Sequence, residues 1–279
     1  MSTLGAALAQ AHALGLDRLD AQLLLGHLLA RPRGWLIAHD GDPLAAEIEA
    51  RYAALCARRA AGEPLAYLVG EREFHGLTLQ VGPAVLVPRP DTETLVDWAL
   101  EILAGPLAGH AAPRVIDLGT GSGAIALAVK RACPRCLVTA TDRSGAALDQ
   151  ARANAARLGL AADFRAGDWW QAVDGQVFDL VLSNPPYIAA GDPHLAALVH
   201  EPLQALTPGG DGLDAIRRIV AGAAPHLPPG GWLLLEHGWD QADAVQAQLQ
   251  AAGYSAVQTR RDLAGQARCT GGQRPAAVR

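Results

Sequence analysis

A rigid polar segment follows an apolar run near the middle of the chain. The hexapeptide SNPPYI, from Ser183 to Ile188, comes directly after the mostly apolar residues 178–182. Proline lacks an N–H donor, fixes its own φ and pushes the preceding residue into an extended conformation. Asn184 and Pro185 are therefore expected to be stiff and to lie outside any hydrogen-bonded ladder. A carboxamide held in this way is suited to binding and orienting a polar substrate group.

A glycine-rich segment, DLGTGSGA from Asp117 to Ala124, lies between a predicted strand and a predicted helix. Glycines there let the backbone approach a ligand, and the free N–H groups of the helix favour an anionic group. Asp142 ends the next predicted strand, 23 residues after Gly119, where a carboxylate can accept both ribose hydroxyl protons. The pair predicts a nucleoside cofactor. The spacing also fits G-x-G-x-x-G/A, so a nicotinamide cofactor is an open alternative.

Three further residues bear on which cofactor binds. Asp117 precedes the first glycine by two residues, where a carboxylate suits a ligand with a positive amino group, as in S-adenosyl-L-methionine, better than a pyrophosphate. Asp168 and Trp169 follow the third predicted strand. An acid there can accept from an adenine amino group and an indole can stack on the base. The alternative is a buried tryptophan beside an acid at a strand end.

These residues need a scaffold that gathers the ends of several strands. After Pro113 the pattern predicts strands at 114–118, 137–141, 162–166, 178–182 and 232–235, weaker strands near 255–259 and 267–270, and helices at 122–131, 146–158, 213–224 and 241–252. Such alternation predicts a mainly parallel sheet covered by helices on both faces. Ligands of such sheets bind at the carboxyl ends of the strands.

The chain before this region has a different pattern. Apolar residues recur at helical spacing from residue 3 to about 61, and alternating β-branched residues around two glycines predict a hairpin within residues 74–87. We therefore expect a small helical domain at 1–70 that binds the substrate, a β-hairpin linker at 71–90 and a catalytic domain at 91–279.

The composition excludes several classes of protein. The longest uncharged stretch, residues 219–235, contains three prolines and a histidine, and the first 30 residues lack a basic start. Neither a membrane span nor a signal peptide is expected, which favours the cytoplasm. The net charge of −5 gives no global attraction to a polyanion. Cys133 and Cys136 have no second pair for structural zinc, and no metal site is expected.

Taken together, the glycine loop, Asp142 and the NPPY segment resemble class I S-adenosylmethionine-dependent methyltransferases that methylate amino groups. Further segments resemble the release-factor glutamine methyltransferases, the PrmC/HemK family: FHG at 74–76, VPRPDTE at 87–93, HEPL at 200–203 and LEHG at 235–238. The similarity covers nearly the whole chain, including the leading helices. It implies an α/β, Rossmann-like fold with a mainly parallel seven-stranded sheet.

The resemblance also implies an activity, which is methylation of the side-chain amide of the glutamine in the Gly-Gly-Gln loop of class 1 peptide chain release factors. The implied cofactor is S-adenosyl-L-methionine. The predicted cofactor residues are Arg89, Asp117, Gly119, Thr120, Gly121, Ser122, Gly123, Asp142, Asp168, Trp169 and Asn184. The predicted substrate residues are Asn184, Pro185, Pro186 and Tyr187, of which Asn184, Pro185 and Tyr187 are the predicted catalytic residues.

This chemistry explains the residue types of the loop. An amide nitrogen is a poor nucleophile because its lone pair is delocalised into the carbonyl group. Its two N–H groups need two acceptors, which the Asn184 side-chain oxygen and the Pro185 carbonyl can supply. Tyr187 can add a cation–π interaction of roughly 0.5 to 2 kcal/mol if its ring faces the nitrogen. Alignment should be the larger effect, since orienting reactants lowers a barrier by about 7 kcal/mol or more.

Three alternatives stay open on the sequence alone. A DNA or RNA adenine methyltransferase shares the NPPY loop, but residues 1–75 hold seven arginines against nine acids, which favours a protein partner. A nicotinamide-linked oxidoreductase leaves the NPPY loop without a role. A cofactor-binding module without catalysis is the third. The roles of Arg89 and Glu201 are open, and Gly271-Gly272-Gln273, which repeats the expected substrate tripeptide, is interpreted as a coincidence at a strand-end turn.

Overall fold

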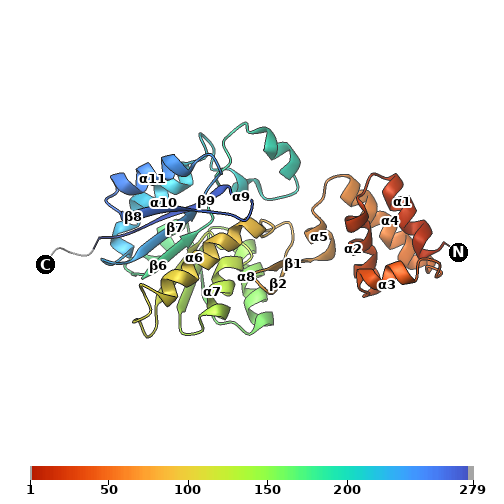
Figure 1. Cartoon of the computed structure of the whole chain (residues 1–279), viewed down its shortest axis with the longest axis horizontal. Coiled ribbons are helices and arrows are strands. Elements are labelled where there is room, and N and C mark those ends of the chain that lie inside the picture. Colours follow the sequence, from red (N-terminus) through yellow and green to blue (C-terminus); the bar gives the residue numbers. More distant parts are fainter. Residues whose placement is uncertain (1, 276–279) are drawn as a thin grey trace. The chain divides into compact units, whose positions relative to one another are not determined.

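The computed structural model describes residues 2–275, and the chain divides into two compact units between Glu71 and Arg72 (Figure 1). The hairpin, β1 (Glu71–Phe74) and β2 (Leu77–Gln80), belongs to the second unit except for its first residue, Glu71. The N–H of Gln80 donates to the side chain of Asn154 in α8 (Gly145–Leu158) at 2.7 Å. The separate linker at 71–90, like the limits 1–70 and 91–279, stays a prediction.

The first unit is helical over the residues that the structure describes. Its helices are α1 (Leu4–Ala13), α2 (Arg18–Leu29), α3 (Arg33–Ala38), α4 (Ala46–Ala60) and α5 (Leu65–Val69). The Thr3 and Asp17 side chains cap the first two, accepting from backbone N–H groups at 3.2 and 2.8 Å, because an N-cap oxygen satisfies a donor that the helix leaves free. The core contains Leu24, Leu25 and Leu36, all fully buried.

The second unit is built on a seven-stranded sheet with the order β5-β4-β3-β6-β7-β9-β8. Its strands are β3 (Arg114–Leu118), β4 (Leu137–Asp142), β5 (Asp163–Ala166), β6 (Leu180–Ser183), β7 (Trp232–Glu236), β8 (Ser255–Arg261) and β9 (Ala267–Gln273). β9 is antiparallel to β7 and β8, and the other pairs are parallel. The prediction of a mainly parallel sheet is confirmed.

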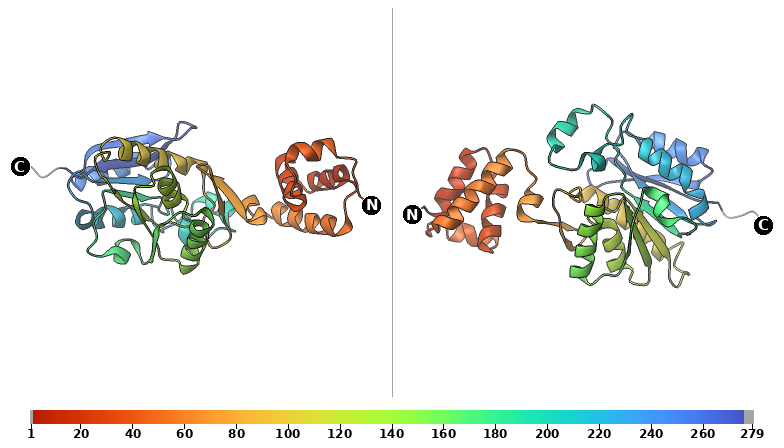
Figure 2. Two further views of the ribbon diagram at one scale, coloured as in Figure 1. Left: turned by 90° about the horizontal axis from the view of Figure 1, so that it is seen from below. Right: turned by 180° about the vertical axis from the view of Figure 1, so that it is seen from behind.

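Helices cover both faces of this sheet (Figures 1 and 2). Those that pack on it are α6 (Glu93–Ala104), α7 (Ala124–Ala132) and α8 on one face and α10 (Asp214–Gly222) and α11 (Ala242–Ala251) on the other. The second unit also contains α9 (Leu203–Leu206) and the 3₁₀ turns η1 (Pro90–Thr92), η2 (Trp169–Val173), η3 (Pro193–Leu198) and η4 (Ala224–His226). Successive strand residues point to opposite faces, so Leu234 packs in the core with α6 and α7, while Leu233 and Leu235 pack with α10 and α11.

Several predicted boundaries differ from the observed ones by one to three residues, and two of these differences have a local reason. The helix expected from Ser122 begins at Ala124, because Gly123 has φ +86°, a left-handed conformation that a right-handed helix excludes. The strand expected from Phe178 begins at Leu180, and the Phe178 N–H donates instead to the His226 carbonyl at 2.8 Å. Both shifts lie beside loops.

The C-terminal glycines belong to a strand and not to a turn, which corrects the expectation for Gly271-Gly272-Gln273. A side chain at Gly271 would place its Cβ 2.4 Å from Leu234 Cδ2, so β7 approaches too closely for any residue but glycine. Gln273 donates to the Gly230 carbonyl at 2.9 Å. Packing of the sheet therefore explains this tripeptide. No helix within residues 2–275 combines the length and apolar character that crossing a bilayer requires.

Candidate active site

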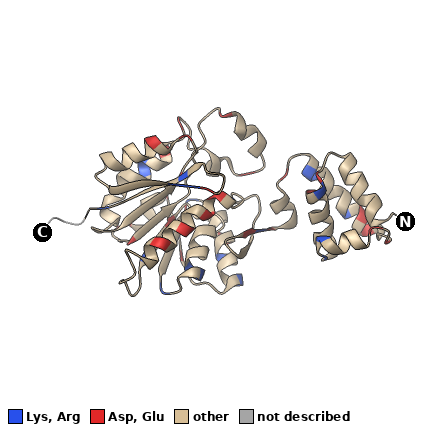
Figure 3. Ribbon diagram, in the orientation of Figure 1, with Lys and Arg blue, Asp and Glu red and all other residues tan. Residues whose placement is uncertain are grey.

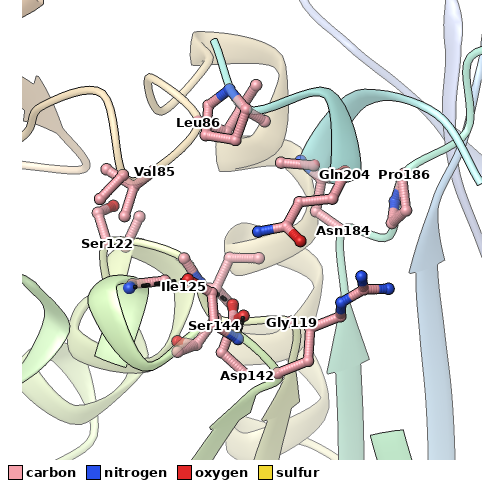
Figure 4. A pocket seen from close by; sticks show the side chains of 18 of the residues that line it. Val85, Leu86, Gly119, Ser122, Ile125, Asp142, Ser144, Asn184, Pro186 and Gln204 are labelled. Carbon is pink, nitrogen blue, oxygen red and sulfur yellow. Dashed lines mark hydrogen bonds between the residues drawn. The ribbon is translucent and has the colours of Figure 1, made fainter. Parts of the chain in front are cut away.

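A cavity lies at the carboxyl ends of β3, β4, β5 and β6, where the parallel register brings the strand ends to one edge. It encloses about 1000 Å³, part of it open to solvent. Figure 4 shows Asn184, Pro186 and Gln204 along one part of its wall and Ser122, Ile125, Asp142 and Ser144 along another. The remaining lining residues that the argument uses are Arg89, Thr92, Gly119, Thr120, Gly121, Asp168 and Trp169.

The loop after β3 forms the floor of this cavity and depends on its glycines. Gly119, Gly121 and Gly123 have φ values of +77°, +55° and +86°, a region that residues with a side chain rarely adopt. The N–H groups of Gly119 and Thr120 both donate to the Thr141 carbonyl, at 2.9 and 2.8 Å. The loop is therefore tied to the end of β4.

Asp142, at the end of β4, is tied to the main chain on both sides. Its Oδ2 accepts from the Gly121 N–H at 2.9 Å and its Oδ1 from the Ser144 N–H at 2.8 Å. Burial raises the pKa of this carboxyl, and the two backbone N–H groups partly offset that rise. The side chain lines the cavity with both oxygens held in place, which suits it to accept from a ligand's hydroxyl groups.

Asp168 and Trp169 also line the cavity. Trp169 has φ +52°, which is unusual for a bulky residue, and its ring lies over the glycine loop, so that a Cβ at Gly119 would be 3.3 Å from Cζ3. Asp168 forms an ion pair with Arg218 at 2.5 Å. The indole is held in a strained conformation at the cavity wall, where an aromatic ring can cover a planar base.

Asp117 lies beneath the glycine loop and is not among the lining residues. It is fully buried, and Oδ2 accepts from the Thr120 hydroxyl at 2.6 Å. Its other oxygen, Oδ1, has no hydrogen-bond partner within residues 2–275. Burial raises the pKa of this carboxyl to about 7. The carboxylate supports the loop that touches the cavity.

The NPPY residues divide into two groups. Asn184 and Pro186 line the cavity, whereas Pro185 and Tyr187 are outside the lining. The Tyr187 hydroxyl donates to Glu236 Oε1 at 3.2 Å, and its carbonyl accepts from Gln241 at 3.0 Å. Burial raises the pKa of Tyr187. These contacts anchor the loop to β7 and the start of α11.

Arg89 and Glu201 join two walls of the cavity. Arg89 lines it and forms a short ion pair with Glu201, whose side chain is 2% exposed. The second Glu201 oxygen accepts from the Val87 N–H at 3.0 Å. The pair therefore holds residues 87–89 against the segment before α9.

Sequence reasoning missed several residues at the cavity. Thr92 accepts a hydrogen bond from Asn184 Nδ2 at 3.1 Å, although 92 residues separate them. Gln204 extends from α9, a helix of four residues that is too short to give a periodic signal, and its carboxamide points into the cavity (Figure 4). The segment VPRPDTE, which ends in Thr92 and Glu93, was the sequence feature from which a role for Thr92 could have been predicted.

Among the described residues, no group of three His, Cys, Asp or Glu side chains is arranged to hold a metal ion. Cys133 and Cys136 lie between α7 and β4, at the helix-to-strand turn that the pattern predicts. Their sulfur atoms are 3.0 Å apart, and burial raises the pKa of Cys136 to about 12.

Known proteins resemble this chain over most of its length. A family model described as the methyltransferase small domain matches residues 92–213, and the PrmC N-terminal domain matches residues 3–70. A release factor glutamine methyltransferase of Bordetella pertussis is 54% identical over 92% of this chain and 95% of its own. The chain belongs to the release factor glutamine methyltransferase family. Another relative of that name, from Burkholderia pseudomallei, is 52% identical over 93% of each chain.

Solved structures support the fold of this family member. The catalytic domain of human Mettl16 with an RNA hairpin has a TM-score of 0.59 at 15% identity, covering 84% of this chain and 83% of that one. The Thermus thermophilus 16S rRNA methyltransferase RsmC, with AdoMet and guanosine, has a TM-score of 0.55 at 21% identity, covering 73% and 49%. At such identities the likeness concerns the fold alone, and it confirms the class I methyltransferase prediction.

Proposed function

We propose that this protein transfers a methyl group from S-adenosyl-L-methionine to the side-chain amide nitrogen of the Gly-Gly-Gln glutamine in class 1 peptide chain release factors. Relatives above 50% identity over nearly the whole chain carry the name of this activity. The observation that carries the proposal is the position of Asn184: its carboxamide lines the same cavity as Asp142 and the glycine loop.

The cavity fits the proposed cofactor on its own residues. Asp142 offers two fixed acceptor oxygens for a ribose, and Trp169 offers an aromatic face beside the glycine loop. The left-handed glycines keep side chains out of the floor. S-adenosyl-L-methionine, when bound, supplies an electrophilic methyl group on a sulfonium. Asp168 and Arg89 line the cavity and would contact the cofactor. Asp117 lies beneath the glycine loop and acts on the cofactor site indirectly, through its hydrogen bond with Thr120.

Asn184 and Pro185 prepare the amide nitrogen. Nδ2 of Asn184 donates to Thr92, so Oδ1 is the atom left to accept from a substrate N–H group. The Pro185 carbonyl is the second proposed acceptor, and Pro186 stiffens the loop that carries both. Acceptors placed beforehand favour the transition state, in which positive charge develops on nitrogen. Tyr187 holds the loop through Glu236 and takes no part in a cation–π contact in this account.

The charges of the first unit favour a protein partner. Acidic and basic residues are both present on its helices (Figure 3), and several are paired, such as Arg59 with Asp20 and Arg58 with Glu63, both at 2.5 Å. A reader of nucleic acid is expected to carry a basic surface. We infer that the first unit contacts the release factor, that nucleic acid is not a direct substrate, and that the protein works in the cytoplasm, where release factors act.

The test is methyl transfer from labelled S-adenosyl-L-methionine to a purified class 1 release factor, read by peptide mass spectrometry. We expect one methyl group on the glutamine, none on a factor in which that glutamine is replaced by glutamate, and none on RNA or DNA. Asn184→Ala should lower kcat strongly with little change in the Kd for the cofactor. Label on nucleic acid and none on the glutamine would refute the proposal.

A further inference from the structure

The Asn184 carboxamide must face one particular way for the proposed reaction. A carboxamide has a donor end, the NH₂ group, and an acceptor end, the oxygen. The substrate amide also presents an NH₂ group, so Asn184 must present Oδ1 to it. An Asn184 turned by 180° would set two donor groups against each other. Something in the protein must therefore determine which end of Asn184 faces the cavity.

Thr92 contacts the donor end of Asn184. It lies at the end of η1, is 4% exposed, and accepts from Asn184 Nδ2 at 3.1 Å. A threonine hydroxyl, however, has one proton and can equally donate. If Thr92 donated toward Asn184, the oxygen would turn to it and the NH₂ group would turn to the cavity. The direction of the Thr92 proton thus decides the orientation of Asn184.

Glu236, at the end of β7, is the group that can hold this proton. It is 1% exposed; burial raises the pKa of its carboxyl, and the neighbouring Thr92 hydroxyl acts to lower that pKa. Oε1 accepts from Tyr187, and Oε2 has no hydrogen-bond partner among the residues that the structure describes. A buried carboxylate with an unused oxygen is a stronger acceptor than a neutral carboxamide.

We propose that Glu236 and Thr92 are positioning residues that fix the orientation of Asn184: the carboxylate takes the Thr92 proton, Thr92 accepts from Asn184 Nδ2, and Asn184 Oδ1 is presented to the substrate amide. This inference rests on the proposed function, because it concerns the same site. In this arrangement one carboxylate, that of Glu236, holds both Asn184 and Tyr187, the first and last residues of the NPPY loop. Glu236 accepts from Tyr187, and in this proposal it acts on Asn184 through Thr92, which accepts from Asn184 Nδ2.

The surroundings of Glu236 connect this arrangement to pH. The charged and titratable groups that face it are Arg268 and Cys269 of β9, Asp91 of η1 and Tyr187. Arg268 lies 3.5 Å from Asp91 and favours the ionised carboxylate, whereas Asp91 opposes it. Burial raises the pKa of Glu236 to about 7. Once Glu236 is protonated, it no longer acts as a carboxylate acceptor for the Thr92 hydroxyl. The kcat should therefore fall as the pH decreases through about 7.

Substitutions at Thr92 separate hydrogen bonding from packing. Thr92→Val keeps the shape and loses the acceptor, and Thr92→Ser keeps the hydroxyl. We expect Thr92→Val to lower kcat about ten- to hundredfold, as misorientation of a reacting group does, with an unchanged Kd for the cofactor. Thr92→Ser should restore most of kcat. Thr139→Val, at a buried threonine of β4, is the matched control and should behave as the wild type.

Glu236→Gln tests the source of the orientation. It should lower kcat and remove the fall of kcat at acid pH that the wild type shows. A readout that needs no activity is hydrogen exchange of the Asn184 side-chain NH₂ group by NMR, which should be slow in the wild type and fast in Thr92→Val and Glu236→Gln. Normal melting temperatures would show that the variants fold.

Several results would overturn the inference. They are wild-type kcat in Thr92→Val, equal loss in Thr92→Ser and Thr92→Val, an acid limb that persists in Glu236→Gln, or NH₂ exchange that is the same in all forms. If the wild type itself leaves the release factor unmethylated, the proposed function fails, and the exchange experiment still decides whether Thr92 and Glu236 hold Asn184.

Discussion

Replacing Asp142 by asparagine tests the proposed cofactor site at its best-held residue. In the folded protein Oδ2 accepts from Gly121 N–H at 2.9 Å and Oδ1 from Ser144 N–H at 2.8 Å. Each oxygen has a further lone pair for a ribose hydroxyl. Asparagine keeps one oxygen and puts an NH₂ donor in place of the other. That donor faces a backbone N–H group and can no longer accept from the ribose.

The magnitude follows from the lost hydrogen bond. A hydrogen bond to a charged group contributes about 1.5 to 3 kcal/mol, and about 1.4 kcal/mol corresponds to a factor of ten in Kd. We expect the Kd for S-adenosyl-L-methionine to rise about ten- to hundredfold. At saturating cofactor kcat should change little, because Asp142 does not contact the reacting nitrogen in this account.

Isothermal titration calorimetry with S-adenosylhomocysteine measures this effect without turnover. Asp149→Asn is the matched control: it makes the same change on α8, where the Asp149 side chain is 79% exposed and pairs with Arg152 at 3.2 Å. Its Kd should stay within about twofold of the wild type, as expected for an exposed ion pair. Wild-type affinity in Asp142→Asn, or equal losses in both variants, would refute the reasoning.

Three further predictions concern stability. Burial raises the pKa of Asp117 to about 7 from an ordinary 3.8, so between about pH 4 and 7 the folded protein keeps a proton that the unfolded chain releases. Stability therefore falls as the pH rises through that window. Asp117→Asn should flatten this pH dependence, measured by urea unfolding across the window. Gly271→Ala places a Cβ 2.4 Å from Leu234 Cδ2 and should lower the free energy of unfolding by about 1 to 3 kcal/mol, seen as a lower melting temperature. Arg89→Met leaves the buried Glu201 carboxylate without its cation and should cost about 1 to 3 kcal/mol in urea unfolding, a value reduced because Arg89 is 36% exposed.

Each of these changes has a control in the same unit. Asp149→Asn should leave the pH dependence of unfolding as it is. Gly145→Ala adds a Cβ with no atom within 4 Å and should not destabilise. Arg217→Met breaks ion pairs whose partners are about half exposed and should leave the stability close to that of the wild type. A test variant that matches its control contradicts the corresponding prediction.

The sheet and the strand-end residues were accessible from sequence because their signals are local. Short apolar runs ending at Leu118, Thr141 and Leu182 predict strands, and parallel strands bring their carboxyl ends together. The same rule gathers the glycine loop, Asp142, Trp169 and Asn184 at one cavity. Local patterns failed at boundaries, where Gly123 delays a helix and Phe178 bonds outside the sheet, and at Gly271, which belongs to a strand and not to a turn.

The contacts that hold the site in place were not accessible, because they join residues far apart in the chain. Asn154 is fully buried and donates to carbonyls of the hairpin and of Ser122, at 2.9 Å each. Glu201 meets Arg89 across 112 residues. Nothing in the periodicity around such residues distinguishes a buried partner from an exposed polar side chain. Asp117 is a case in which the sequence position suggests a contact with the ligand, but the side chain is buried under the glycine loop.

The central claim is that Asn184 and Pro185 hold the glutamine amide at the cofactor cavity. A crystal structure with S-adenosylhomocysteine and a peptide carrying the Gly-Gly-Gln sequence tests it most directly. We predict the glutamine nitrogen at about 3 Å from both Asn184 Oδ1 and the Pro185 carbonyl oxygen, facing the cofactor's sulfur. A glutamine bound elsewhere, or an Asn184 that turns its NH₂ group to the ligand, would contradict the account.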